Sequence, residues 1–281
     1  MTSLGKLFRK LMLDNPPLQV VGTINAYSAM LAKEAGCQAI YLSGSGVACA
    51  SYGLPDLGMT NLSEVVEDAS RITAACDLPL LVDIDTGFGN EFGIHRTIRH
   101  LERAGVAGVH LEDQVAEKRC GHRPGKQIVP IEEMEDRLKA ALDARQDPNF
   151  VIIARTDAYE KEGLAGTIER VKRYQAIGAD LVFLEALPDL DAFLQCHQAF
   201  PLPILANSTE FGKTPLYSRE AYHQAGVSVI LYPLSAFRAM SKAALAVYKA
   251  IVEQGSQAGQ LAQMQTREEL YQVLHYYDYE K

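Results

Sequence analysis

Eight short apolar stretches, each followed by a helix-forming stretch, restrict the fold of this 281-residue chain more than any other feature. They are rich in Val, Ile and Leu and read as continuous apolar runs, which is typical of parallel strands covered on both faces. We place them at residues 20–25, 39–42, 79–84, 108–111, 150–154, 181–184, 203–206 and 227–231. Strands that alternate with helices indicate parallel βαβ units. Eight such units predict an α/β fold, a (β/α)8 barrel of the TIM type.

Helix-forming stretches lie between these strands and extend beyond them at both ends. Between the strands we expect helices at residues 28–35, 93–104, 131–145, 167–177, 190–200 and 218–225, and one that Asn61 or Ser63 caps and that reaches residue 75. A helix at residues 2–13 precedes the barrel, and helices at 235–253 and 266–274 form a C-terminal extension, so that residues 1–281 make a single domain. The alternative is an open doubly wound sheet. However, residues 44–46 (Gly-Ser-Gly) lack the third glycine and the following acid of the dinucleotide-binding fingerprint.

Charge and composition restrict the partners and the cellular compartment that we expect for this protein. The formal net charge of −8 argues against nucleic acid as a partner. No apolar run approaches the roughly 20 residues that a membrane span requires, and residues 1–10 lack the pattern of a secretory signal. The cysteines are scattered and odd in number, which favours free thiols in a reducing compartment. We therefore expect a cytoplasmic protein that binds neither nucleic acid nor membrane.

Polar residues stand where most of the predicted strands end. They are Ser43, Asp83, Asp85, Glu112, Arg155, Glu185, Asn207 and Thr209. In a (β/α)8 barrel the carboxyl ends of all strands meet at one face, and that face carries the active site. The pattern therefore predicts an active site built from several strand ends.

Asp83 and Asp85 are the candidates for a metal site. They are two residues apart on a predicted strand, so their side chains are expected to point the same way, and two such carboxylates repel unless they share a cation or a proton. With Asp56 and Glu112 also available, oxygen ligands of this kind suit Mg²⁺, or Mn²⁺ in its place. The alternative is a strand-end turn, in which Asp85 begins an Asx-turn.

The segment after the fourth strand combines cations with one thiol, Cys120. Its neighbours include Lys118, Arg119, His122 and Arg123. Cationic neighbours favour the thiolate, which can act as a nucleophile, an acid or a redox sensor. The alternatives are an apolar filler or an incidental loop thiol. Because glycines at 121 and 125 bracket this cationic loop, we expect it to close over an anionic substrate.

Four further residues are weaker candidates. Arg155 and Arg238 can bind carboxylates through guanidinium forks, although an ordinary surface arginine is the alternative for Arg238, and Arg267 is equally ambiguous. Tyr41 lies on a predicted strand, where a tyrosine most often packs in the core with its hydroxyl tethered. Near a strand end it could also carry a proton.

These stretches together resemble a known family. Residues 118–124 (KRCGHRP) are similar to the signature of the 2-methylisocitrate lyases, within the isocitrate lyase/phosphoenolpyruvate mutase superfamily. Supporting similarities lie in residues 54–58, 83–89, 112–114, 154–157, 207–212 and 232–240. The resemblance extends over nearly the whole chain.

The resemblance implies a barrel whose last helix is exchanged between the subunits of a homodimer or tetramer. It also implies Mg²⁺-dependent cleavage of the tricarboxylate 2-methylisocitrate to pyruvate and succinate, in the methylcitrate cycle of propionate breakdown, with Asp83 and Asp85 as metal ligands. Positions that match the family's substrate contacts are Ser43, Gly44, Ser45, Cys120, Gly121, Arg155, Glu185, Asn207, Ser208, Thr209, Arg238 and Arg267, to which we add His122. This chain departs from the family pattern at Ser45, where glycine is more common, and at Ser208, where an apolar residue is common.

The implied chemistry assigns roles to individual residues. Loss of the proton from the tertiary hydroxyl lets a carbon–carbon bond break in the retro-aldol sense, and negative charge moves onto succinate. Arg155 and Arg238 stabilise that charge, and Cys120 protonates the carbon. The other catalytic candidates are Tyr41 as the base and Glu112, with a metal-bound carboxylate as the alternative base.

Two other functions stay open on the sequence. One is isocitrate lyase, which releases glyoxylate and succinate and also carries a cysteine in this loop, although those chains are usually longer. The other is a barrel that binds a dicarboxylate without catalysis, which would not need the acids, the thiol and the arginines together.

Overall fold

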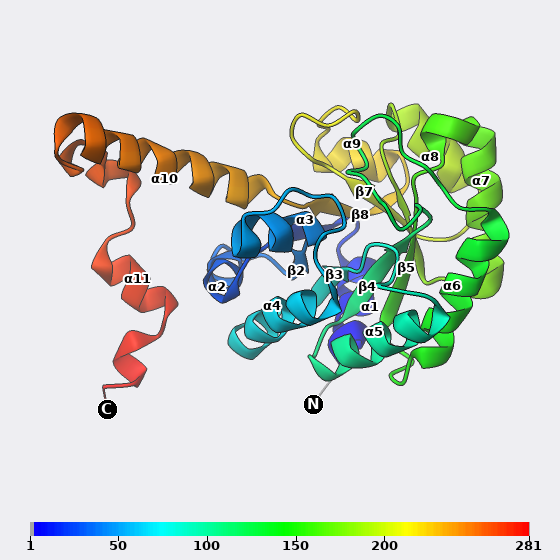
Figure 1. Ribbon diagram of the computed structural model, residues 1–281, viewed down its shortest axis with the longest axis horizontal. Helices are drawn as coiled ribbons and strands as arrows, with labels where there is room; N and C mark the ends of the chain where they lie inside the picture. Colours follow the sequence, from blue (N-terminus) through cyan, green and yellow to red (C-terminus); the bar gives the residue numbers. More distant parts are fainter. Residues whose placement is uncertain (1–2, 281) are drawn as a thin grey trace.

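The computed structural model describes residues 3–280 and shows a closed barrel of eight parallel strands surrounded by helices (Figure 1). Each strand pairs with its neighbours in chain order, and the first closes the barrel against the last. The strands are β1 (Leu18–Gly22), β2 (Ala39–Leu42), β3 (Leu80–Asp83), β4 (Gly108–Glu112), β5 (Val151–Thr156), β6 (Leu181–Leu184), β7 (Ile204–Asn207) and β8 (Val227–Tyr232). The predicted barrel is confirmed, and the open doubly wound sheet is excluded.

The largest shift in strand position occurs at β1, which begins at Leu18 and ends at Gly22 instead of spanning 20–25. Residues beyond Gly22 leave the strand because Asn25 caps the next helix, α2 (Ala26–Glu34). Its side chain accepts a hydrogen bond of 2.8 Å from the Ser28 N–H, which satisfies a donor at the helix start.

Helix α1 (Leu4–Asp14) closes the amino-terminal end of the barrel. Its Phe8 and Met12 belong to the same buried cluster as Leu18 and other inward-facing strand residues. Residue 2, where we expected this helix to begin, lies outside the described residues. Because α1 fills this end, the opposite end, where the strands terminate, is left for a cavity.

The helices that follow the strands form an outer layer around the barrel. They are α4 (Leu62–Ala75), α5 (Glu91–Arg103), α6 (Ile131–Ala144), α7 (Tyr159–Ile177), α8 (Leu190–Ala199) and α9 (Arg219–Gln224). Asn61 caps α4, as one of our two alternatives predicted, and accepts hydrogen bonds from two N–H groups of the first turn. Helix α7 starts at Tyr159 rather than at residue 167, and the non-helical backbone of Gly163 (φ 65°, ψ −170°) kinks it.

After β2 the chain forms a helical turn, in a stretch to which the sequence pattern assigned neither a helix nor a strand. It consists of α3 (Gly44–Gly46) and the π-helical segment η1 (Val47–Ser51). The Gly44 N–H donates to Asp83 Oδ2 over 3.1 Å. The positive end of this turn therefore faces an acid at the end of β3, a favourable arrangement of charge.

The last part of the chain, residues 235–280, leaves the barrel as an arm (Figure 1). This C-terminal arm contains α10 (Ser235–Gln254), η2 (Ala258–Gln263), α11 (Arg267–Val273) and η3 (Tyr276–Asp278). It returns toward the barrel near α2, where the Tyr27 hydroxyl donates to Gln265 over 2.8 Å. The predicted helical extension is confirmed. Its exchange between subunits stays a prediction, since one chain is described.

Candidate active site

Strand alternation places a ring of polar side chains at the carboxyl end of the barrel. The inner core contains Tyr41, Leu81, Ile153, Phe183 and Leu205. Side chains two residues further along a strand point to the same side. These positions are Ser43, Asp83, Arg155, Glu185 and Asn207, and all of them line one cavity of about 450 Å³. Side chains alternate with a period of two along each strand, and this alternation turns the polar residues at the strand ends toward the same cavity.

A loop between β4 and α6, residues 116–126, covers this cavity. Lys118 Nζ lies 2.8 Å from Asp85 Oδ1, and His122 Nε2 lies 2.8 Å from Glu185 Oε1. Between them, a Cβ on Gly121 would lie 2.5 Å from Glu185 Cγ. Only glycine lets the loop approach the cavity wall this closely.

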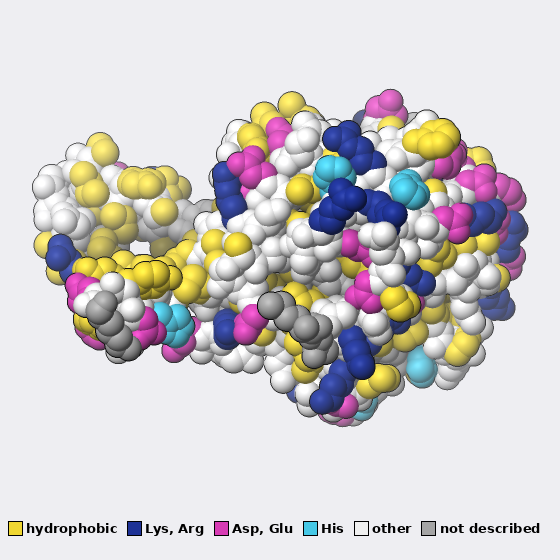
Figure 2. Space-filling model, turned by 90° about the horizontal axis from the view of Figure 1, so that it is seen from below, with side chains coloured by type: hydrophobic (Ala, Val, Ile, Leu, Met, Phe, Trp, Pro, Cys, Tyr) yellow, Lys and Arg dark blue, Asp and Glu magenta, His cyan; other side chains and the backbone are white. Residues whose placement is uncertain are grey.

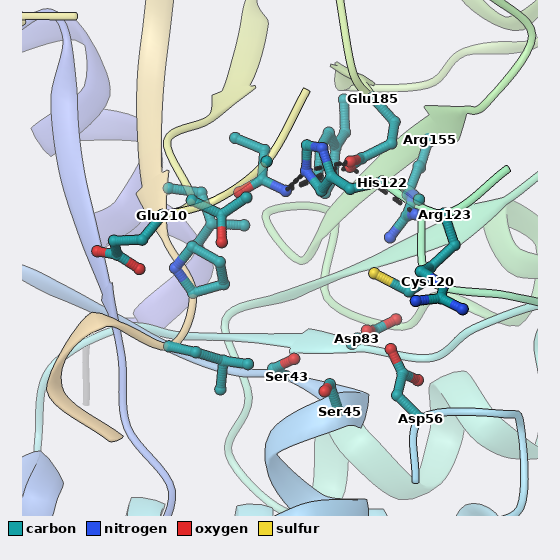
Figure 3. Close-up of a pocket in the computed structure, with 18 of the residues that line it drawn as sticks. Ser43, Ser45, Asp56, Asp83, Cys120, His122, Arg123, Arg155, Glu185 and Glu210 are labelled. Carbon is teal, nitrogen blue, oxygen red and sulfur yellow. Dashed lines mark hydrogen bonds and ion pairs between the residues drawn. The ribbon is translucent and has the colours of Figure 1, made fainter. Parts of the chain in front are cut away.

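The thiol of Cys120 belongs to this covering loop. Figure 3 shows its sulfur pointing toward the middle of the cavity, between Arg155 and Asp83. The side chain is partly exposed. It is therefore neither a buried filler nor directed away from the site, and it faces the space that a ligand would occupy.

The acids at the floor of the cavity differ in pKa and therefore in how readily they ionise. Burial and the neighbouring Asp83 carboxylate raise the pKa of Asp85 to about 6. Burial also opposes ionisation of Asp83, but His110, Lys118 and Arg155 outweigh it and lower its pKa to about 2. Burial raises the pKa of Glu112 well above its usual value despite the nearby Arg155. The floor is therefore a site that gains from an added cation.

Asp83 and Asp85 face the same space, but for a reason other than the predicted one. β3 ends at Asp83, so the two residues are not neighbours on one face of a strand. Asp85 lies beyond it in the left-handed region (φ 47°), and its N–H donates to Asp83 Oδ1 over 3.0 Å. A turn closed by the Asp83 side chain thus brings the carboxylates together, and the proposed Asx-turn starts at Asp83 instead of Asp85.

The donor set at this floor fits a divalent cation. Among residues 3–280, the buried Glu112 Oε1 has no polar partner, and a single cation contacts each of two neighbouring oxygens: Lys118 Nζ lies 2.8 Å from Asp85 Oδ1, and Arg155 Nε lies 3.2 Å from Glu112 Oε2. The Lys118 ammonium lies 2.5 Å from Asp56 Oδ1, and it supplies positive charge between Asp56 and Asp85. Within the described part of the chain, no three His, Cys, Asp or Glu side chains form a metal-binding group. The arrangement suits an ion such as Mg²⁺, which keeps water or substrate oxygens as most of its ligands.

Three acidic side chains surround the Arg155 guanidinium in the cavity wall. Its Nε lies 2.9 Å from Asp157 Oδ2 and 3.2 Å from Glu112 Oε2, and its Nη2 lies 3.8 Å from Glu185 Oε2. Burial alone would raise the pKa of Glu185, but Arg155 and His122 lower it to about 2. The guanidinium is thus fixed in orientation toward the cavity, as binding of a planar carboxylate requires.

Tyr41 lies at the base of the cavity and contacts a buried histidine. Its hydroxyl is 2.7 Å from His110 Nε2. Burial and the nearby Asp83 raise the pKa of Tyr41 well above its usual value, and burial lowers that of His110 to about 4. Both groups are therefore neutral near pH 7. The neutral phenol weakens the case for Tyr41 as the base.

Most of the predicted substrate-binding residues meet at this cavity. Besides the strand-end ring and the loop, it is lined by Tyr41, Ser45, Asp56, Thr209 and Arg238. Gly44, Asp85 and Glu112 lie directly behind this lining, in contact with Asp83, Lys118 and Arg155 respectively. The sequence prediction of one shared site is supported by this placement, while the individual roles stay predictions.

Two predicted residues lie elsewhere. Ser208 is buried, with its N–H bonded to the Leu231 carbonyl, and it does not line the cavity. Because residues alternate along β7, its side chain points to the opposite side of the strand from Asn207. Arg267 is exposed on α11 in the C-terminal arm, away from the cavity of the same chain (Figure 1). Its role in substrate binding therefore stays a prediction that depends on the exchange of the C-terminal helices.

The sequence prediction missed several residues of the site. Lys118 was noted as a cation but not as the group that lies between Asp56 and Asp85. Arg238 was predicted as a substrate-binding residue, but its contacts at the rim were not: its Nε is 3.7 Å from Glu210 Oε2 and its guanidinium lies 5.8 Å from the Phe211 ring centre. An apolar side made of Phe183, Leu231, Pro233 and Leu234 also went unpredicted. No polar signal marks such residues in a sequence.

These features define a class of protein: a (β/α)8-barrel enzyme whose cavity, acidic at its floor and cationic at its walls, suits small, multiply charged anions. A family model described as phosphoenolpyruvate phosphomutase matches residues 8–252. The chain is 58% identical over 282 residues to a 2-methylisocitrate lyase of Vibrio cholerae, covering 98% of this chain and 92% of that relative.

Solved structures agree with this likeness. A 2,3-dimethylmalate lyase has a TM-score of 0.90 at 30% identity, covering 97% of this chain and 92% of its own. A phosphonopyruvate hydrolase in complex with oxalate and Mg²⁺ has a TM-score of 0.86 at 25% identity, covering 99% and 97%. The chain belongs to the phosphoenolpyruvate mutase/isocitrate lyase superfamily, and within it to the family of 2-methylisocitrate lyases.

Proposed function

We propose that this chain is a carbon–carbon lyase that cleaves 2-methylisocitrate to pyruvate and succinate in the methylcitrate cycle. The observation that carries this proposal is the convergence of an acidic floor, the Arg155 guanidinium and the Cys120 thiol on one cavity. The activity named for the relative from Vibrio cholerae, at 58% identity over nearly the whole chain, supports it.

Each part of the cavity has a task in this reaction. Arg155, held by Asp157 and Glu112, binds a substrate carboxylate and stabilises the charge that develops on succinate. Arg238 at the rim binds a second carboxylate after leaving Glu210. Cys120 delivers a proton to the carbanion carbon. The covering loop excludes water, so that the carbanion is protonated by the thiol alone.

We further propose that Asp83 and Asp85, with Asp56 and Glu112 nearby, hold Mg²⁺ or Mn²⁺. The bound ion would supply Lewis acidity for the substrate hydroxyl and its carboxylate. Proton removal from that hydroxyl falls to Tyr41 or to a floor carboxylate. The raised pKa values of Tyr41 and Glu112 mean that either base needs the added positive charge of the site to ionise.

The apolar side of the cavity favours the methylated substrate. Phe183, Leu231 and Leu234 provide a niche for one methyl group, which is worth about 1–3 kcal/mol, or about 10–200-fold in kcat/KM. We expect purified protein with Mg²⁺ to prefer 2-methylisocitrate over isocitrate by a factor in this range. Coupled assays for pyruvate and for glyoxylate measure the two reactions.

The same assays separate the alternatives. Equal or better cleavage of isocitrate would identify an isocitrate lyase. Tight binding of either compound by calorimetry without any keto-acid product would identify a non-catalytic dicarboxylate-binding barrel.

We also propose that the C-terminal arm packs against a second copy of this chain in a homodimer or tetramer. Large apolar side chains of α10 are exposed, among them Leu245, Tyr248, Ile251 and Val252, with Val252 exposed by 84% (Figure 2). Exposed large apolar side chains that recur at three- and four-residue spacing on one helix, as Leu245, Tyr248 and Val252 do, are typical of a protein interface. An arm that reaches a partner would also bring Arg267 toward the partner's cavity, as helix exchange implies.

Replacing Leu245 by Asp tests this interface. A buried, unpaired carboxylate is costly, so we expect the variant to elute as a monomer in size-exclusion chromatography with light scattering, while the wild type elutes as a dimer or tetramer. Lys242→Asp, at an exposed polar position of the same helix, is the matched control. A monomeric wild type would contradict the proposal.

Within residues 3–280, no helix combines the length and apolar character needed to cross a membrane. A cytoplasmic location is our proposal from the scattered free thiols.

A further inference from the structure

Gln114 is a buried polar residue that the proposed chemistry does not use. It follows β4 and is only 1% exposed. Its side-chain amide makes two hydrogen bonds to one residue of the covering loop: Arg119 N–H donates to Gln114 Oε1 over 3.0 Å, and Gln114 Nε2 donates to the Arg119 carbonyl over 3.0 Å. The Arg119 side chain is exposed, so Gln114 holds the main chain of this residue.

The main chain of Gln114 is itself firmly placed. Arg137 of α6 donates to the Gln114 carbonyl over 2.8 Å and to the Glu112 carbonyl over 3.1 Å. An antiparallel bridge joins Gln114 to Ile128. The amide therefore projects into the loop from a rigid position at its base.

The residue that Gln114 holds lies between the two loop groups that enter the cavity. Lys118, on one side of Arg119, reaches Asp85 over 2.8 Å. Cys120, on the other side, lines the cavity. The other contacts of the loop with the barrel are made by side chains: His122 lies 2.8 Å from Glu185, and at the end of the loop the buried Lys126 lies 2.8 Å from Asp157. Without the hydrogen bonds at Arg119, the main chain that carries the thiol would be held only through the side chains of its neighbours.

We propose that Gln114 is a positioning residue, whose amide fixes the peptide on either side of Arg119 and thereby aims Lys118 and Cys120 into the cavity. This inference rests on the proposed lyase function for its catalytic consequence. The primary amide is suited to the task because it donates and accepts at once, and the Arg119 main chain offers both an acceptor and a donor.

Gln114→Met is the decisive variant, since methionine has a similar length and forms neither hydrogen bond. We expect kcat for 2-methylisocitrate to fall about 10- to 100-fold, as the loss of two such hydrogen bonds suggests, while KM changes less than about threefold. Hydrogen exchange of the peptide containing residues 117–121 should become faster at the same time. Gln114→Glu, assayed at pH 8, should show the same defects, because an ionised carboxylate cannot donate to the Arg119 carbonyl.

Gln127→Met and Gln127→Glu are the matched controls. Gln127 is exposed at the other side of the loop base, where its main-chain carbonyl accepts from Val115 over 3.0 Å. Both controls should behave as wild type. Wild-type kcat in Gln114→Met, or a lower kcat with unchanged exchange of residues 117–121, would overturn the proposal.

Hydrogen exchange also distinguishes a failure of the Gln114 proposal from a failure of the proposed lyase function. If the wild type does not cleave 2-methylisocitrate but Gln114→Met still exchanges faster at residues 117–121, the lyase function fails and the positioning of the loop stands. If the wild type is active and exchange is unchanged in the variant, the positioning fails alone.

Discussion

Cys120→Ser is expected to lower kcat for 2-methylisocitrate by about 10²–10⁴-fold, the usual contribution of a general acid. Serine keeps the size of the side chain, but its hydroxyl is a far weaker acid than a thiol. The sulfur points into the cavity and makes no hydrogen bond to any of residues 3–280, so substrate affinity should change little (Figure 3). Steady-state kinetics and calorimetry of substrate binding measure the two effects separately.

Cys37→Ser is the control for this experiment. Cys37 is also a partly exposed free thiol, but it lies outside the cavity, so its replacement should leave kcat unchanged. If Cys120→Ser retained most of the activity, the thiol would be structural or regulatory. Protonation would then pass to another loop group, and His122, 2.8 Å from Glu185, would be tested first.

Removal of divalent metal is expected to have the second large effect. Excess chelator should lower turnover by at least about 10³-fold, because a Lewis acid contributes several kcal/mol to such a step. Added Mg²⁺ or Mn²⁺ should restore it. Asp85→Asn should remain inactive at metal concentrations that saturate the wild type, since it removes a charged oxygen ligand. Full activity in excess chelator would contradict the metal assignment.

The stability of the metal-free protein provides an independent check on Asp85. Its pKa of about 6 lies above the value of about 3.9 for a free aspartate. The folded state therefore binds this proton more tightly than the unfolded state does. Protonated Asp85 therefore adds to the free energy of unfolding. This contribution is fully present below about pH 4 and is lost as the pH rises through 6.

Asparagine at this position resembles the protonated acid. In chelator, Asp85→Asn should melt at a higher temperature than the wild type at pH 7.5, and this advantage should shrink toward pH 4.5. Differential scanning fluorimetry at the two pH values measures both. A marked loss of melting temperature at pH 7.5 would show that the ionised carboxylate has a structural role in the turn after β3.

The site was predictable where it depends on local pattern. Asp83, Arg155 and Glu185 each follow an inward-facing apolar residue by two positions, so their convergence follows from strand period and barrel closure. The helical turn at residues 44–51 was missed because it depends on a contact with Asp83, which comes from a different strand. Lys118 and Gln114 were missed as site groups for the same reason, since their partners lie in other segments or across the loop.

By itself the sequence determined the barrel, the end of it that carries the site, and the residue types available there. Apolar runs, their spacing and the polar residues at strand ends are local properties of the sequence. They can therefore be recognised without knowing which distant segments come into contact. The tertiary structure alone decided which acid is ionised and which residues hold the loop. It also buried Ser208 outside the cavity lining and placed Arg267 on the C-terminal arm. Burial and charge–charge distances set these outcomes, and both depend on segments far apart in the chain that meet only when the barrel closes.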